Sequence, residues 1–300
     1  QERGERPVIF DVAVNERLLN AVGVDPASVE TVRGDILDLP QLVSAVRDYD
    51  VDQIIHLAAF LGEEVQRRPY TGVRLNLMGT VNVLEAARLE KVSRITFPSS
   101  GTVYLGSLGE GLGTIDETIP INPPSVYAAT KGGSEFLGNT YSRMYGFEFV
   151  CVRYVGGLYG PSPTTMKATR EQAIQEMIRA ALKREEATIK WPYGPTEILY
   201  GKDAAKGTVL AALKAEHKDR LFHIGCSGMI TGDEILAELK RQFPESRVTL
   251  EKGSDPMGYS ANRPLTDLSR ASEQLGFEAD YTLDRSLTDY AETMKKLEAL

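Results

Sequence analysis

Tyr127 and Lys131 stand four positions apart in a stretch whose pattern predicts a helix over residues 125–145. Residues four apart on a helix share a face, so the phenol and the ammonium are expected to point the same way. A free phenol titrates near ~10, and a neighbouring cation lowers that value because it favours the phenolate. The hydroxyl of Ser100, presented from a strand end, could orient the same substrate oxygen. These three residues predict a site for proton transfer at a hydroxyl group.

Two elements must position these groups. Ile95 to Ser100 is an apolar run that ends in hydroxyl residues, which predicts a strand delivering Ser100 to the carboxyl edge of a sheet. The run from Val51 to Ala58 is continuous and apolar, as expected for a buried parallel strand. An aromatic residue and a lysine at this spacing are more often a core side chain beside a lysine whose stem is packed and whose charge is solvated. The neighbouring elements therefore decide whether the Tyr127–Lys131 pair is structural or catalytic.

Residues 95–104, read Ile-Thr-Phe-Pro-Ser-Ser-Gly-Thr-Val-Tyr, and the order of elements around them resemble the extended short-chain dehydrogenase/reductases, the NAD-dependent epimerase/dehydratase family. The resemblance implies an α/β fold with a Rossmann-like doubly wound parallel sheet and a smaller α+β substrate lobe. It implies an NAD-binding domain over residues 1–160 and a mainly substrate-binding lobe over 161–300, with segments near 196–224 returning to the large domain. It also implies that Ser100, Tyr127 and Lys131 form a catalytic triad.

The cofactor expectation starts from Asp11, which ends the short strand pattern Pro7 to Phe10. In nucleotide-binding α/β folds, a carboxylate at the end of the second strand binds the adenosine ribose hydroxyls and disfavours a 2′-phosphate. Asp11 therefore favours NAD over NADP, although an acidic turn residue is the alternative. The family resemblance implies further cofactor contacts with Asp35, Ile36, Leu57, Ala58, Ala59, Tyr127, Lys131, Tyr154 and Val155.

No glycine-rich turn precedes Asp11, because the only glycine ahead of it is Gly4, which follows no strand. A dinucleotide site of this type needs an earlier strand and a glycine-rich turn for the pyrophosphate. We therefore expect that the natural chain carries a preceding βα unit. The alternative is a protein that has lost its cofactor.

The substrate lobe departs from the family pattern. Nucleotide-sugar enzymes usually carry an arginine before the strand here aligned with Ile198 to Tyr200, where it holds a diphosphate, and this chain has Thr196 at that place. Lys202 and Arg263 could compensate. The candidate substrate contacts are Thr102, Trp191, Thr196 and Arg263, although Trp191 is equally compatible with a core position.

Composition restricts the remaining classes. The formal net charge of -8 argues against a nucleic-acid partner. The two cysteines, Cys151 and Cys226, lie in apolar segments and read as buried thiols, and the three histidines lack metal-ligand spacing. We expect no metal, no apolar run long enough to cross a bilayer, a cytoplasmic location and a homodimer.

Three functions fit this sequence. The first is an NAD-dependent epimerase acting on a sugar or nucleotide sugar through transient hydride transfer. The second is a dehydrogenase or reductase of a sugar acid or another small hydroxy compound. The third is a non-catalytic protein that has lost NAD binding. The 4,6-dehydratases of the family carry an acidic pair after the catalytic hydroxyl, and Gly101 and Thr102 occupy those positions here.

Overall fold

Four parallel strands form the central sheet, in the order β10 (Leu221–Ile224), β6 (Glu148–Tyr154), β4 (Arg94–Ser100) and β3 (Gln53–Ile55). The computed structural model describes residues 6–108, 113–162, 170–191, 194–216, 218–253 and 264–298. Strand β4 is buried until its last residue, Ser100, which is half-buried. Burial of successive residues means that both faces of β4 are covered, so β4 fixes Ser100 at the carboxyl edge of the sheet.

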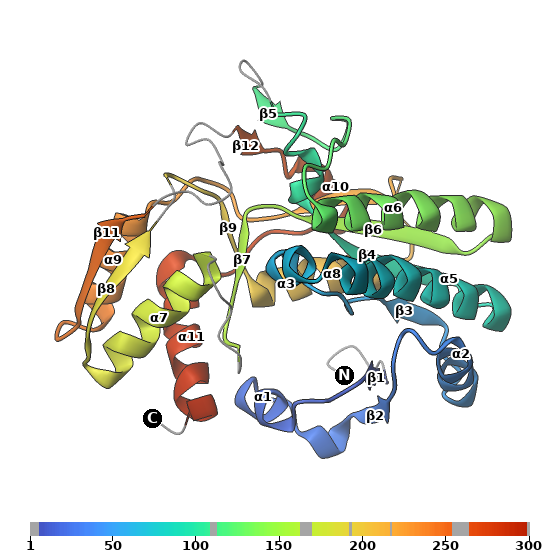
Figure 1. The fold of residues 1–300 in the computed structure, drawn as a ribbon, viewed down its shortest axis with the longest axis horizontal. Helices are drawn as coiled ribbons and strands as arrows, with labels where there is room; N and C mark the ends of the chain where they lie inside the picture. Colours follow the sequence, from blue (N-terminus) through green and yellow to red (C-terminus); the bar gives the residue numbers. More distant parts are fainter. Residues whose placement is uncertain are drawn as a thin grey trace.

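The other elements flank these strands (Figure 1). Helices and helical turns of the first half are α1 (Glu16–Ala21), η1 (Pro26–Ser28), α2 (Leu39–Asp48), α3 (Gly62–Arg67), α4 (Pro69–Val73), η2 (Arg74–Met78), α5 (Gly79–Glu90), η3 (Gly101–Tyr104) and α6 (Val126–Tyr145). Those of the second half are α7 (Arg170–Lys183), α8 (Gly201–Leu213), α9 (Gly232–Gln242), α10 (Ser269–Leu275) and α11 (Leu283–Glu298). The remaining strands are β1 (Val8–Asp11), β2 (Glu30–Arg33), β5 (Thr114–Ile115), β7 (Gly157–Tyr159), β8 (Glu186–Trp191), β9 (Ile198–Tyr200), β11 (Arg247–Lys252) and β12 (Leu265–Thr266).

The sheet is covered on both faces, and strand β6 shows how. Phe149 and Cys151 join the apolar cluster that includes residues of α5, whereas Val150 and Val152 join the cluster that includes residues of α8 and α10. Successive strand residues point to opposite faces, so α5 and α8 pack on opposite sides. This is the Rossmann-like doubly wound arrangement, and it places α6 against β4 and β6.

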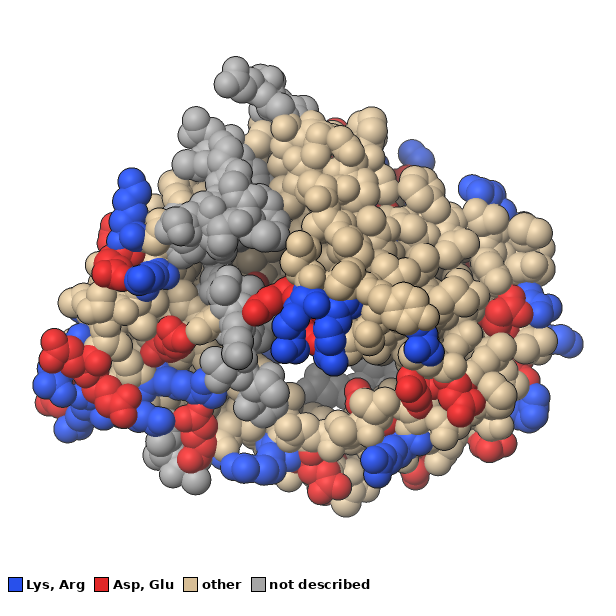
Figure 2. Space-filling model, in the orientation of Figure 1, with Lys and Arg blue, Asp and Glu red and all other residues tan. Residues whose placement is uncertain are grey.

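Strands β1 and β2 form a separate parallel pair. In the part of the chain that the structure describes, β1 pairs only with β2, and β3 pairs only with β4. Figure 1 shows the pair apart from the central sheet, and Figure 2 shows an opening through the molecule between these two parts. Ile55 at the end of β3 is exposed. An edge of this kind offers unpaired backbone groups to a further strand.

A second lobe lies on the left in Figure 1 and is built from α7, β8, α9, β11 and α11. Its strands β8 and β11 pair in parallel. The chain returns to the large sheet through β9, α8 and β10, since α8 packs on β4 and β6 and β10 pairs with β6. The carboxyl edge of the central sheet therefore lies beside the junction of the two lobes.

One boundary differs from expectation: the apolar run from Val51 to Ala58 contains only the three-residue strand β3. Between α4 and α5, the chain forms the π-helical turn η2. A π-helical turn inserts an extra residue and is often found at functional sites. Here it contains Asn76. Across the described ranges, no helix is long and apolar enough to span a bilayer.

Candidate active site

Ser100 ends β4 and begins the turn η3, which bends the chain away from the sheet edge. Its Oγ accepts a hydrogen bond from the backbone N–H of Thr102 (3.2 Å) and another from the Thr102 hydroxyl (2.9 Å). Because both bonds occupy lone pairs of Ser100, its own proton is directed elsewhere. It forms a hydrogen bond with Tyr127.

Helix α6 brings Tyr127 to this edge. Ser125 caps the helix by accepting a hydrogen bond from the N–H of Ala128 (3.2 Å), which starts the helix two residues before the phenol. Tyr127 is half-buried, and its ring lies against Gly62 at the start of α3.

Lys131 is buried one helical turn further along α6. Its Nζ donates to the carbonyl oxygen of Pro98 (2.8 Å) and lies 4.7 Å from the centre of the Phe97 ring. Burial lowers the pKa of Lys131 to about 8, because the charged form loses solvation. The ammonium is therefore held beside the end of β4, at Pro98, two residues before Ser100.

The expectation that Lys131 lowers the pKa of Tyr127 is wrong for this structure. Burial dominates and raises the pKa of Tyr127 to about 12, while the hydrogen bond from Ser100 acts in the opposite direction. The physical reason is that the Lys131 ammonium contacts Pro98 and the Phe97 ring. Tyr127 is thus a neutral phenol at neutral pH, the form that carries the proton.

Asn76 ties this site together from the π-helical turn. Its side chain accepts from the N–H of Phe60 (2.7 Å) and donates to the Phe60 carbonyl (3.0 Å) and to Thr130 Oγ1 (3.2 Å). Thr130 in turn donates to the carbonyl of Tyr127 (2.8 Å). The loop after β3 and the first turn of α6 are therefore held by one buried amide.

The residues expected to hold the cofactor lie along the carboxyl ends of the strands. Asp11 is exposed at the end of β1, Asp35 is exposed after β2, and Leu57, 63% exposed, follows β3. Tyr154 pairs in register with Ser100. An accessible carboxylate, an exposed apolar residue and a buried ammonium suit the ribose, the ring systems and the negative charge of a dinucleotide.

The expected cofactor-binding residues differ in burial and in hydrogen bonding. Ile36 is buried and its carbonyl accepts from Asn82 Nδ2 (2.9 Å), and Ala58 and Ala59 are half-buried after β3. The Tyr154 hydroxyl is engaged with Thr208 Oγ1 (2.7 Å), and Val155 is buried. The Tyr154 hydroxyl therefore faces α8.

The candidate substrate-binding residues lie in different environments. Trp191 is buried in the core of the second lobe, against Gly232, so it packs with that core instead of lining the site. Thr196 is buried and its backbone bridges Ile230. Lys202 Nζ is held by Asp289 Oδ1 at 2.6 Å. Arg263 lies outside the described residues. Among the candidates that the structure describes, only Thr102 forms a hydrogen bond with a residue of the triad, Ser100.

A buried polar network behind the triad was not predicted. Glu135 on α6 pairs with Arg153 on β6 (2.5 Å), and Arg153 also donates to the Tyr104 hydroxyl. Tyr104 is linked to His223 Nε2 at 2.7 Å. Burial lowers the pKa of His223 to about 4, so its ring is neutral. In the sequence, the only sign of this network is that single polar residues occur within apolar segments.

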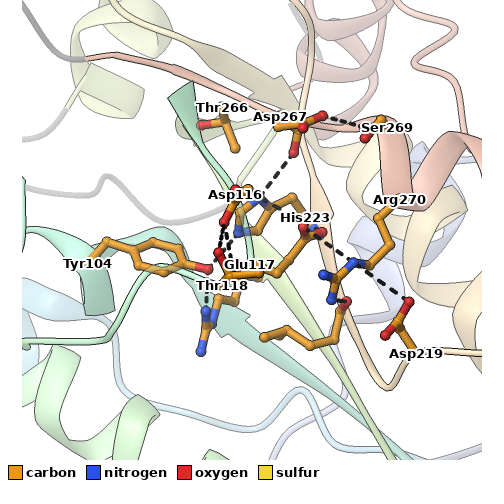
Figure 3. Close-up of polar contacts among 12 residues, drawn as sticks. Tyr104, Asp116, Glu117, Thr118, Asp219, His223, Thr266, Asp267, Ser269 and Arg270 are labelled. Carbon is orange, nitrogen blue, oxygen red and sulfur yellow. Dashed lines mark hydrogen bonds and ion pairs between the residues drawn. The ribbon is translucent and has the colours of Figure 1, made fainter. Parts of the chain in front are cut away.

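Figure 3 shows where this network reaches the loop before α6. Glu117 accepts from the backbone N–H of His223 (3.0 Å) and lies 3.5 Å from Arg270 Nε on α10. Burial raises the pKa of Glu117. These contacts fasten the loop to β10 and α10, so Glu117 supports the fold of the site from outside.

His56 is also buried, with Nε2 3.0 Å from Thr80 Oγ1. The described residues contain no group of three side chains suited to a metal.

A doubly wound parallel sheet with a serine at a strand end and a Tyr-x-x-x-Lys helix defines the short-chain dehydrogenase/reductase class. The sequence profile of the NAD dependent epimerase/dehydratase family matches residues 6–225, and this chain belongs to that family. The family is NAD dependent, so the chain is an enzyme of this family and its cofactor is NAD.

Three known proteins illustrate the likeness. The UDP-glucuronate 4-epimerase of Thermodesulfobacterium geofontis is 27% identical over 84% of this chain and 75% of that protein. The structure of Thermus thermophilus UDP-glucose 4-epimerase in complex with NAD has a TM-score of 0.77, at 22% identity, covering 96% and 98% of the two chains. A GalE-like L-threonine dehydrogenase from Cupriavidus necator has a TM-score of 0.81, at 23% identity, covering 98% and 93%.

Proposed function

We propose that this protein epimerises a sugar or nucleotide sugar by transient oxidation at one carbon. The observation that carries the proposal is the convergence of Ser100, Tyr127 and Lys131 at the carboxyl edge of the sheet. A phenol and a hydroxyl in hydrogen-bond contact offer two partners to one substrate oxygen. The exposed carboxylate of Asp11 and the exposed Leu57 support a dinucleotide beside them.

The residues divide the work as follows. Tyr127 gives a proton to, or takes one from, the substrate oxygen, and Ser100 orients that oxygen. Lys131 holds a positive charge at the end of β4, where it would bind the nicotinamide ribose. Asp11 and Asp35 would bind the adenosine end. When bound, NAD supplies the acceptor and donor of hydride.

An elimination step has no support among these residues. The position after Ser100 is Gly101, whose missing side chain would meet Val155 at 3.2 Å, and the Thr102 hydroxyl is engaged with Ser100. Neither residue can serve as the acid of a dehydratase. Inversion or simple oxidation at the carbon that bears the oxygen is therefore favoured.

The proton chemistry predicts the pH dependence of alcohol oxidation. The pKa of Tyr127 is raised to about 12, so the phenolate fraction grows tenfold per pH unit between about pH 6 and pH 10. The pKa of Lys131 is lowered to about 8, so above that pH the ammonium fraction falls by the same factor. We expect the single-turnover rate to rise to about pH 8 and then level off. Stopped-flow measurement across this range checks the result, and a rate that falls steadily from acid to neutral pH would contradict it.

The function is tested with the protein expressed from its complete gene. Purified protein is analysed for retained NAD and then incubated with UDP-glucose, UDP-galactose or UDP-glucuronate, and products are identified by NMR while NADH is followed by its absorbance. We expect retained NAD, an inverted sugar and no net NADH. A protein that retains and binds no NAD would contradict the proposal and favour a non-catalytic role.

A dehydrogenase of a small hydroxy compound is the second candidate. Thr196 offers no charge where an arginine would bind a diphosphate, and Lys202 is already held by Asp289. A smaller substrate needs no diphosphate contact. This alternative predicts NADH in proportion to substrate, and the same assay with sugar acids and hydroxy amino acids separates the two functions.

We also propose that the enzyme works in the cytoplasm as a homodimer, through the outer faces of α5 and α6. Phe136 and Met144 on α6 are 65% and 66% exposed, and Leu89 on α5 is exposed as well. Neighbouring apolar side chains of this size indicate an interaction surface. A second copy of the chain is the occupant that would cover both helices symmetrically.

Phe136→Glu is expected to convert the dimer to a monomer, because a charge would be buried at the centre of the interface. Size-exclusion chromatography with light scattering measures the mass. Leu265→Glu, at an exposed position on β12, is the matched control and should leave the mass unchanged. A wild-type protein that is monomeric at high concentration would contradict the proposal.

A further inference from the structure

Three consecutive residues of β4 each hold one residue of α6. The carbonyl of Pro98 accepts from Lys131 Nζ (2.8 Å), Ser99 Oγ donates to Glu135 Oε1 (2.5 Å), and Ser100 bonds to Tyr127. The residues on α6 stand four apart, at 127, 131 and 135, so they share one face of the helix. The register of α6 on the strand end is therefore fixed at three successive points, two of which belong to the triad.

Glu135 is the third point and takes no part in the proposed chemistry. Its side chain is 6% exposed, and both carboxylate oxygens accept from Arg153, Oε1 from Nε (2.9 Å) and Oε2 from Nη2 (2.5 Å). Taking a carboxylate and a guanidinium out of water is costly, so a buried pair contributes little stability by itself. The pair therefore calls for a role beyond stability.

That role is indicated by the charges that face Lys131. The groups on neighbouring elements are His56 after β3, Cys151 and Arg153 on β6, and Tyr127 and Glu135 on α6. Burial keeps His56 neutral, with a pKa of about 3, and raises the pKa of the Cys151 thiol well above its usual value. Tyr127 is neutral as well. Among these groups, Glu135 carries the only negative charge near the ammonium.

We propose that Glu135 is a positioning residue that keeps Lys131 charged and seated at the end of β4, with Ser99 and Arg153 fixing the carboxylate. The inference rests on the proposed function only for the statement that the Lys131 ammonium serves catalysis. Burial lowers the pKa of Lys131, and Cys151 and then Glu135 act in the opposite direction. Because burial keeps Cys151 a neutral thiol, Glu135 is the charged group that opposes the loss of the ammonium. Arg153 holds both carboxylate oxygens, so the negative charge stays next to the helix turn that carries the lysine.

The test compares charge with shape at position 135. Protein labelled with ¹³C at lysine Cε is titrated by NMR, and the Lys131 signal is assigned by its loss in Lys131→Met. In Glu135→Gln, which keeps the shape and removes the charge, we expect the Lys131 midpoint to fall by about one pH unit or more. In Glu135→Asp, which keeps the charge, the midpoint should stay nearly unchanged.

Glu148→Gln is the matched control. Glu148 is a carboxylate at the opposite end of β6, bonded to Arg94 and Arg220, so its loss should leave the Lys131 midpoint in place. If Glu135→Gln does not fold, Glu135→Gln with Arg153→Gln buries two neutral amides and is expected to lower the midpoint too, because Glu135 is the charge that acts on Lys131. An unmoved midpoint after Glu135 loses its charge, or an equal shift in Glu135→Asp, would overturn the proposal.

This titration needs no substrate, so it separates the inference from the proposed function. If no sugar is converted but the midpoint shifts as expected, the function fails and the role of Glu135 holds. With an active enzyme, Glu135→Gln should lower kcat by about fivefold or more at pH 8 while KM changes less than about twofold, since the ammonium fraction falls. A change confined to KM would contradict the proposed role.

Discussion

Tyr127→Phe is expected to lower kcat by a factor of about 10² to 10⁴, because it removes the group that exchanges a proton with the substrate oxygen. The ring remains in place against Gly62, and the lost contact is the hydrogen bond with Ser100. The fold and the affinity for NAD should therefore change little. Turnover of the substrate found in the NMR screen, together with calorimetric titration of NAD, measures both quantities.

Tyr141→Phe is the matched control for this substitution. Tyr141 lies on the same helix and is half-buried, with its hydroxyl bonded to Glu85 on α5. Removing that hydroxyl should leave kcat within about twofold, since Tyr141 touches no residue of the triad. If Tyr127→Phe retained more than a tenth of the wild-type kcat, proton transfer by Tyr127 would be ruled out.

Arg153→Met is expected to destabilise the protein by about 3–5 kcal/mol, because it leaves the Glu135 carboxylate buried without its partner. The Tyr104 hydroxyl loses a donor at the same time. Urea denaturation followed by circular dichroism gives the free energy of unfolding. Replacing both members, as Glu135→Leu with Arg153→Met, should recover most of the loss because no buried charge is left.

Arg241→Met provides the comparison at the surface. Arg241 is exposed on α9 and pairs with Glu238 at 2.7 Å, three positions earlier. An exposed pair is solvated in both states, so the unfolding midpoint should be indistinguishable from that of the wild type. Equal destabilisation by Arg153→Met and Arg241→Met would show that burial of the Glu135–Arg153 pair has no energetic consequence.

The elements that carry the triad could be predicted from sequence because their signals are local. Strand β4 was expected to end at Ser100 and does so, and α6 begins after Ser125 and ends at Gly146, which adopts a positive φ of 84°. A capping hydroxyl and a terminal glycine are read directly from residue types. The Rossmann-like class followed from the order of such elements.

The surroundings of the triad could not be predicted because they depend on contacts between distant segments. The network joins Glu135 to Arg153, 18 residues away, and Tyr104 to His223, 119 residues away. The high pKa of Tyr127 is a result of burial, which no spacing records. Trp191 shows the same limit, since a residue in the core and a residue at a pocket have the same sequence signature.

The retention of an isotope at the inverted carbon tests the central claim most directly. A nucleotide sugar that carries deuterium on the carbon to be inverted is incubated with the enzyme in ordinary water, and the product is analysed by NMR and mass spectrometry. Hydride transfer beside Tyr127 predicts an inverted product that keeps its deuterium. An inverted product that has exchanged its deuterium with solvent, or no inverted product with any sugar nucleotide tested, would contradict the account.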